Sequence, residues 1–241
     1  LIIDNTASPV ICKPLAHGAA IVMHSLTKYI GGHGTSIGGI VVDGGNFDWI
    51  KNRKRQPLLN EPDQSYGGAI WADAVPQLTG ANIPFVIRLR VVLLRDTGAP
   101  LAPFNAWQII QGLETVGLRM KQHCSNAEKV VTFLETQKKV KNVIYPTNHQ
   151  GEIKERALKY MKGGYGSLVG MDVGTKENGA KFINNLKMLY HVANIGDARS
   201  LAIHPATTTH SQLNDEELLA AGVTPGYVRL SIGIEHPDDI V

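Results

Sequence analysis

The sequence predicts an α/β protein with two parts, a mixed-sheet part at residues 1–117 and a small C-terminal α/β domain at residues 118–241. Three patterns support this prediction. Short apolar runs end in small or polar residues, as buried strands do. Apolar residues keep helical spacing through residues 104–137, and runs of strand type and helix type alternate beyond them. We place the boundary inside that long helix, near Gly117.

Each element follows from its local pattern. Apolar runs at residues 1–3 and 20–23 end at Asp4 and at His24 with Ser25, which is typical of neighbouring buried parallel strands. After them we expect one helical turn at 14–17, a glycine-rich loop at 31–34, a strand at 37–42, an irregular segment at 51–64, a proline-interrupted apolar region at 66–85 and a helix at 85–94. In the second part we expect strands at 140–145, 167–173 and 188–193 and helices at 152–161 and 176–186.

The composition restricts the class of protein. Hydrophobic residues make up 43% of the chain and charged residues 19%, which is typical of a compact protein and not of a disordered one. No apolar run approaches the roughly 20 residues of a membrane-spanning helix. The net charge of +3 is spread along the chain, which argues against a nucleic-acid or anionic-membrane partner. We expect small molecules or further copies of this chain as partners.

The cysteines and the first residue carry two further expectations. Cys12 and Cys124 lie far apart in the sequence, which predicts neither a disulfide framework nor a thiolate metal site. Two reduced thiols are typical of a reducing compartment, so we expect a cytoplasmic protein. The chain opens at Leu1 with an apolar run and no initiator methionine, so we expect a longer polypeptide around it.

Polar side chains follow the two expected parallel strands. Asp4 and Lys28 each come after a strand, and ligands of open α/β sheets bind at the carboxyl ends of strands. A desolvated lysine can attack a carbonyl and form a Schiff base, and a carboxylate can keep a pyridine nitrogen protonated. The hydroxyls of Ser25 and Thr27 are candidates for holding phosphate oxygens. This pattern is compatible with a pyridoxal phosphate site.

Plainer interpretations of the same residues stay open. Asp4 is followed by asparagine and threonine, a common turn or helix-cap pattern. A lone loop lysine such as Lys28 is usually solvated. The glycines of residues 31–34 are also typical of a tight turn, and no G-x-G-x-x-G or G-K-[ST] phosphate loop is present.

Three separated motifs carry a resemblance to a known family. Residues 25–34 read SLTKYIGGHG and resemble the cofactor-lysine signature of the pyridoxal-phosphate enzymes of cysteine and methionine metabolism. Residues 4–9 (DNTASP) resemble the segment of that family that pairs with the pyridinium nitrogen, and residues 228–235 (VRLSIGIE) resemble its closing motif. Residues 194–212 and 98–106 are similar to the O-acetylhomoserine sulfhydrylase branch of the family.

The resemblance implies a fold-type I enzyme, of which residues 1–117 are the C-terminal part of the cofactor-binding large domain. It implies that Lys28 forms the Schiff base with pyridoxal 5'-phosphate and moves protons. The other implied roles are pyridinium pairing by Asp4, phosphate binding by Ser25 and Thr27, and substrate-carboxylate binding by Arg229 and Asn194. The implied reaction converts O-acetyl-L-homoserine and a sulfur nucleophile into L-homocysteine and acetate, a step of methionine biosynthesis. A homotetramer of dimers with shared active sites is implied, and the sulfur donor is sulfide or a sulfur-carrier protein.

Several alternatives remain beside this interpretation. The same scaffold is compatible with a methionine or cystathionine γ-lyase or a cystathionine γ-synthase, and a chain of this length is compatible with a non-catalytic fragment or assembly module. Arg229 lies between apolar strand residues and is also compatible with pairing to a buried carboxylate. His204 and His210 have no partner at metal-ligand spacing, so we expect structural roles for them and no metal site.

Overall fold

The structure is a computed structural model that describes all 241 residues. Its chain divides into two compact units, each of which is described by itself. The first unit comprises Leu1–Asn5, Pro14–Ser25 and Gly38–Ala106, and the second comprises Thr6–Lys13, Leu26–Ile37 and Trp107–Val241. The sequence-based domain boundary near Gly117 stays a prediction.

The first unit is built on a three-stranded sheet with the order β1-β2-β3. Strands β1 (Ile2–Asp4) and β2 (Ile21–Ser25) are parallel, as predicted, with Asp4 opposite Met23. Strand β3 (Gly39–Asp43) is antiparallel to β2. It begins two residues later than predicted because its first residue pairs with Ser25, where β2 ends, so Ile37 has no strand residue to pair with.

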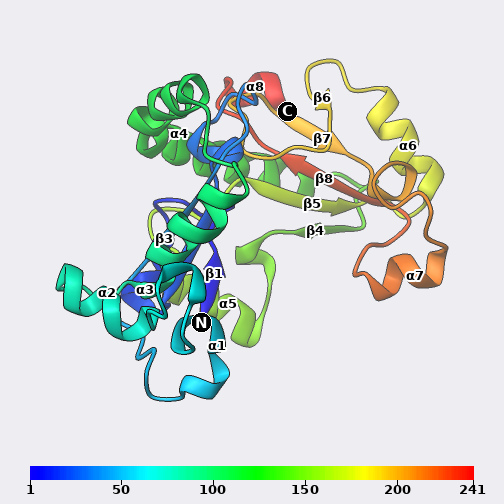
Figure 1. Cartoon of the computed structure of the whole chain (residues 1–241). Coiled ribbons are helices and arrows are strands. Elements are labelled where there is room, and N and C mark those ends of the chain that lie inside the picture. Colours follow the sequence, from blue (N-terminus) through cyan, green and yellow to red (C-terminus); the bar gives the residue numbers. More distant parts are fainter. The chain divides into compact units, whose positions relative to one another are not determined.

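Short helices complete the first unit (Figure 1). One cluster of large apolar side chains forms its core. The helices are α1 (Pro57–Asn60), α2 (Trp71–Thr79) and α3 (Pro84–Arg88), with helical turns at Pro14–His17, Arg53–Arg55, Gln64–Tyr66 and Leu89–Leu94. Ile21 of β2 packs with Trp49 and Trp71 in the core. The proline-interrupted region expected at residues 66–85 contains helix α2, with Pro76 inside it, and the start of helix α3.

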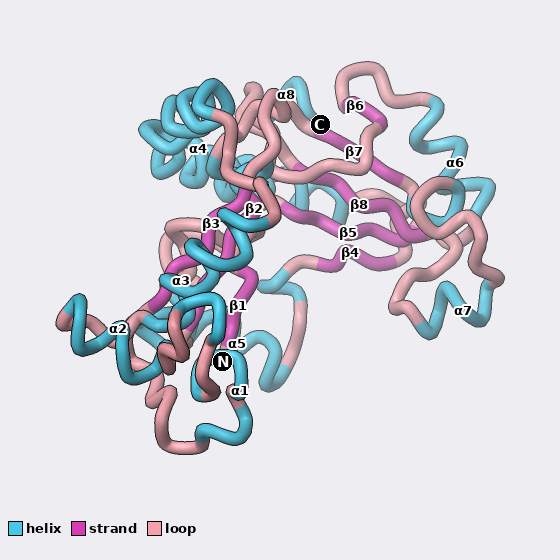
Figure 2. Tube along the Cα trace, viewed as in Figure 1, coloured by secondary structure: helices cyan, strands magenta, loops and turns pink.

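The second unit contains a five-stranded sheet with the order β4-β5-β8-β7-β6, seen as adjacent strands in Figure 2. The strands are β4 (Asn142–Ile144), β5 (Leu168–Asp172), β6 (Tyr190–His191), β7 (Leu201–Ile203) and β8 (Tyr227–Ser231). All neighbours are antiparallel except β6 and β7. The strand expected at 188–193 is shorter in the structure, where only the two residues of β6 are paired. Strand β7 was not expected, because a strand of three residues has no recognisable period in the sequence.

The long helix predicted at residues 104–137 is α4 (Pro103–Glu135). Its C-terminal half packs Val130 and Leu134 against Val169 and Met171 of β5. The remaining helices are α5 (Gly151–Tyr160), α6 (Lys176–Asn184), α7 (Asp215–Ala220) and α8 (Pro237–Ile240). The alternation of strands and helices expected for this part of the chain is thus confirmed.

Strand β8 places a cation on the sheet. Val228 and Leu230 lie in the core that also contains α4. Because side chains alternate along a strand, Tyr227 and Arg229 lie on the opposite face of the sheet. Arg229 pairs in register with Gly170 of β5 and Ile203 of β7.

No single helix combines the length and apolar character needed to cross a lipid bilayer. Helix α2 and the helical residues Pro84–Leu94 pass by length and composition only when taken together, and they are bent by 102° at their break.

Candidate active site

The first unit carries two of the predicted site residues at one edge of its sheet. Asp4 ends β1 and Ser25 ends β2. Because these neighbouring strands are parallel, both residues lie at the carboxyl edge, the edge at which open α/β sheets bind ligands. The backbone N–H of Asn5 donates to the carbonyl of Met23 at 2.9 Å and continues the ladder past Asp4.

His24 is a residue of this edge that the sequence analysis did not select. Its Nδ1 atom is buried and has no hydrogen-bond partner. Burial lowers the pKa of His24, and the negative charge of Asp4 on the neighbouring strand opposes that shift. The signal available in the sequence was its position at the end of the second strand, directly before Ser25.

In the second unit, Lys28 lies in one distorted helical turn, Leu26–Ile30. The N–H of Gly31 donates to the carbonyl of Leu26 at 2.9 Å, and the N–H of Gly32 donates to that of Lys28 at 2.7 Å. Lys28 itself departs from helical geometry, with φ −90° and ψ −130°. The turn therefore holds the lysine backbone in an irregular conformation, and such conformations occur often at functional sites.

The turn places the Lys28 amine beside two residues that are distant in sequence. Lys28 Nζ donates to Asn194 Oδ1 at 2.5 Å, and Arg229 Nη2 donates to the Asn194 carbonyl at 3.4 Å. Asn194 thus contacts both cations, one through its side chain and one through its backbone. Three of the six predicted site residues are brought together in this way, within one unit.

The loop that carries Asn194 is held by hydrogen bonds to the chain just after the lysine turn and to strand β8. Ala198 N–H donates to the Gly32 carbonyl at 2.8 Å, and Gly196 N–H donates to Ser231 Oγ at 3.0 Å. Gly196 has φ +74°, and a Cβ atom there would lie 2.6 Å from the Tyr29 nitrogen. Only glycine therefore permits this approach of the two loops.

The residue after Lys28 anchors the turn in the interior. Tyr29 is fully buried, and its hydroxyl shares a 2.8 Å hydrogen bond with Ser167 Oγ. Its ring meets the edge of the His123 ring with centroids 5.4 Å apart. Burial raises the pKa of Tyr29, so the phenol is neutral at physiological pH. The side chain next to Lys28 is therefore held by both packing and hydrogen bonding.

Arg229 has no acidic partner in this chain. It forms no ion pair, while the ion pairs present involve other residues. The interpretation that Arg229 pairs with a buried carboxylate is therefore wrong for this chain. Arg229 lines a cavity of about 370 Å³ together with Tyr227 and His149. Its charge is available to a carboxylate ligand.

The other candidate residues have simpler surroundings. Thr27 and His33 border a small hollow beside α4, and His33 Nδ1 donates to the Gly31 carbonyl at 2.7 Å. His204 is buried between Thr207 and the Pro225 carbonyl, which supports the structural role expected for it. No group of three or more metal-binding side chains is present.

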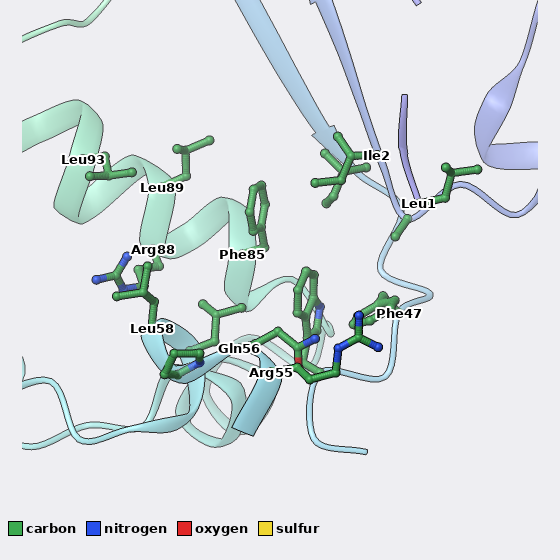
Figure 3. A pocket seen from close by; sticks show the side chains of 15 residues that line it. Leu1, Ile2, Phe47, Arg55, Gln56, Leu58, Phe85, Arg88, Leu89 and Leu93 are labelled. Carbon is green, nitrogen blue, oxygen red and sulfur yellow. The ribbon is translucent and has the colours of Figure 1, made fainter. Parts of the chain in front are cut away.

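A second and more apolar cavity, of about 530 Å³, lies in the first unit (Figure 3). Phe47, Phe85 and Leu58 face it, together with Arg55 and Arg88. None of the predicted site residues lines it. The chemistry of the side chains, and not the size of the cavity, therefore identifies the candidate site.

Comparison with known proteins decides the family. The family model described as Cys/Met metabolism PLP-dependent enzyme matches residues 1–241. This chain belongs to that family. The family resemblance inferred from the motifs is thereby confirmed, and so is the fold class, because solved structures of such enzymes superimpose on nearly the whole chain.

Individual relatives narrow the resemblance within the family. The O-acetyl-L-homoserine sulfhydrylase of Leptospira meyeri is 49% identical over all of this chain. A crystal structure of a putative O-acetylhomoserine (thiol)-lyase from Campylobacter jejuni, which contains a pyridoxyl-lysine phosphate, is 40% identical with a TM-score of 0.88 over 99% of this chain. The cystathionine γ-synthase of Xanthomonas oryzae is 28% identical with a TM-score of 0.74, again over 99% of this chain. The chain spans 55%, 56% and 52% of these three proteins, respectively.

The side chains of this family member fit pyridoxal phosphate. The second unit provides an amine at Lys28 whose hydrogen-bond partner is a neutral amide oxygen, and a guanidinium group at Arg229 with no acidic partner. The first unit provides the carboxylate of Asp4 at a strand edge beside the buried, unpartnered nitrogen of His24. An imine-forming amine, a carboxylate and short hydroxyls are the groups that this cofactor requires.

The close approach of α4 to the lysine turn leads to a test of stability. A Cβ atom at Gly112 would lie 2.2 Å from the Gly31 carbonyl oxygen, whereas one at Gly117 of the same helix meets nothing within 4 Å. We expect Gly112→Ala to lower the free energy of unfolding by about 1–3 kcal/mol. Gly117→Ala, the matched control, should raise it by about 0.5–1 kcal/mol through helix propensity. Urea unfolding of both variants measures this, and equal effects would contradict the close contact.

Proposed function

We propose that the protein catalyses γ-replacement on O-acetyl-L-homoserine. A sulfur nucleophile displaces acetate from the γ-carbon and gives L-homocysteine, so that one C–O bond breaks and one C–S bond forms. The observation that carries the proposal is the grouping of Lys28, Asn194 and Arg229 within one unit. The similarity to the O-acetyl-L-homoserine sulfhydrylase of Leptospira meyeri supports the choice of substrate.

The residues of the second unit have distinct tasks in this proposal. Bound pyridoxal phosphate draws electrons from the substrate and so makes its carbon-bound protons acidic. Lys28 supplies the amine that takes up and returns these protons, since its Nζ is the basic atom of the turn. Arg229 binds the substrate α-carboxylate with two parallel N–H groups. Asn194 positions the lysine amine through its side-chain oxygen and the guanidinium group through its backbone carbonyl.

The residues at the strand edge bind the cofactor in this proposal. Asp4 pairs with the ring nitrogen, and its position at the carboxyl end of β1 supports that role. Ser25 and Thr27 donate hydrogen bonds from their hydroxyls to the phosphate. The two residues are separated by Leu26 alone. These three assignments rest on the match of the motifs to the family together with the chemistry of the side chains.

The assembly and location of the protein are part of the proposal. We propose a homotetramer in the cytoplasm, using sulfide or a sulfur-carrier protein as the donor. Cys12 and Cys124 form no disulfide, which supports a reducing compartment. Light scattering of the purified protein measures the mass of the assembly, and a monomer would contradict the tetramer.

Product analysis tests the proposed reaction. The whole protein, as encoded by its gene and loaded with pyridoxal phosphate, is given O-acetyl-L-homoserine with and without sulfide. We expect homocysteine and acetate in equal amounts, and only when sulfide is present. Formation of 2-oxobutanoate without sulfide would indicate a γ-lyase, and cystathionine formed faster from cysteine than homocysteine from sulfide would indicate a γ-synthase. Absence of any visible cofactor band would overturn the proposal as a whole.

A further inference from the structure

Arg119 of α4 is a buried cation beside the lysine turn. Only 6% of the residue is exposed. Its Nη1 donates to the Tyr29 carbonyl at 2.7 Å, and its Nη2 donates to the carbonyls of Ile30 at 2.9 Å and Gly112 at 2.7 Å. Its Nε donates to Thr115 Oγ1 at 3.1 Å. No carboxylate forms an ion pair with it.

Burying a guanidinium group without a counter-ion costs free energy, because the charge loses its hydration. Other interactions must therefore stabilise the charge of Arg119. Burial lowers the pKa of Arg119, yet an arginine remains protonated in proteins. The charge is balanced here by the carbonyl dipoles of its hydrogen-bond partners. Two of these carbonyls belong to Tyr29 and Ile30, the two residues that directly follow Lys28.

The carbonyls of Tyr29 and Ile30 are the last of the turn Leu26–Ile30. Carbonyls at the end of a helical segment lack backbone donors, and a nearby arginine can bind them. The chain beyond this point leaves the helical path, since Gly32 has φ +73°. The guanidinium of Arg119 therefore replaces the backbone donors that a continuing helix would supply.

Two glycines leave the space that this arrangement needs. A Cβ atom at Gly32 would lie 2.2 Å from Arg119 Nη1. One at Gly112 would lie 2.6 Å from the Ile30 carbonyl oxygen. Both the turn and the helix thus approach the guanidinium group without side chains between them.

We propose that Arg119 is a positioning residue for Lys28. By binding the two carbonyls that follow the lysine, it fixes the irregular backbone of residue 28 and so aims Nζ at Asn194. This inference rests on the proposed function, because it assigns Arg119 an effect on the amine that carries the reaction. Lysine at this position has one nitrogen and cannot span carbonyls of both the turn and the helix as the planar guanidinium does.

The test uses the whole, cofactor-loaded protein and four variants. Arg119→Lys keeps the positive charge but loses the planar set of N–H donors. Arg119→Ala leaves a cavity that free guanidinium ion can enter. Arg53→Lys is the matched control for arginine chemistry, because Arg53 is paired with Asp73 at the surface. Val130→Ala, in the core of the same helix, is the control for destabilisation alone.

Three measurements separate positioning from a general structural role. They are kcat and KM for O-acetyl-L-homoserine, the pH titration of the visible cofactor band, and the response of each variant to guanidinium ion at concentrations far below those that unfold proteins. We expect Arg119→Lys to lower kcat by about 100-fold, since a misplacement of about 1 Å has that effect. Its KM should change little because Arg229 is untouched. The titration midpoint should shift in both Arg119 variants and in neither control.

The outcomes distinguish this inference from the proposed function. Recovery of kcat in Arg119→Ala upon addition of guanidinium ion, with no recovery in Val130→Ala, would support the positioning role. If Arg119→Ala does not fold, the kcat and titration of Arg119→Lys decide. Wild-type kcat and an unshifted titration in Arg119→Lys would overturn the inference while leaving the function intact. A wild-type protein without the reaction would overturn the proposed function first.

Discussion

Replacing Lys28 with alanine is expected to abolish the visible absorbance of the lysine-bound cofactor and to lower kcat by about 10⁴-fold. The amine is the only basic group that the turn Leu26–Ile30 presents to Asn194. A positioned acid or base contributes about 10²–10⁴-fold to rate, and Lys28 is proposed both to take up and to return protons. Absorbance spectra and steady-state kinetics of the purified variant measure the two effects.

A matched control shows that the effect belongs to this amine. Lys121→Ala removes an exposed lysine of α4 and should leave both the spectrum and kcat unchanged. Added methylamine should restore part of the turnover of Lys28→Ala, because it supplies a free base in the space left by the side chain. A Lys28→Ala protein that stays yellow and active would refute the role of Lys28.

Arg229→Lys is expected to raise the KM for O-acetyl-L-homoserine by about 10–100-fold. This is the loss of affinity that corresponds to one missing hydrogen bond to a charged group. Arg229 has no ion pair within the chain, and its one hydrogen bond runs from Nη2 to the Asn194 carbonyl, so its remaining N–H groups can bind a carboxylate. Lysine keeps the charge and loses this paired geometry. The visible cofactor band should be unchanged, because Arg229 is proposed to contact substrate and not cofactor.

The control for this variant is an arginine on the same unit. Arg156→Lys alters an exposed arginine of α5 that pairs with Glu152 one helical turn away. Its KM should equal that of the wild type. A bleached cofactor in Arg229→Lys, with KM unchanged, would show that Arg229 holds the cofactor instead.

Much of the secondary structure followed from neighbouring residues. The parallel strands β1 and β2 were predicted from continuous apolar runs, and the helix α4 was predicted from the helical spacing of its apolar residues. Strand β7 was missed, and β6 was expected to be longer. Both errors concern strands of two or three residues, whose ends depend on which neighbour they pair with and not on their own pattern.

The candidate site divides in the same way. The motif around Lys28 marks the reactive amine by its sequence alone, and the family resemblance added Asn194 and Arg229. Arg119 was not selected, because an arginine between apolar helical residues is most often solvent-exposed. Nothing in its local sequence records that a turn 90 residues earlier lies against it.

By itself the sequence determined the family, the identity of the proposed cofactor lysine and the order of the main strands and helices. The tertiary structure alone decided that Lys28 Nζ meets Asn194, that Arg229 lacks an acidic partner and that Arg119 binds the carbonyls after the lysine. The physical reason is the separation along the chain of the residues that interact. Periodicity and motifs arise between residues a few positions apart, whereas contacts between residues 90 or 166 positions apart exist only once the helices and strands have packed.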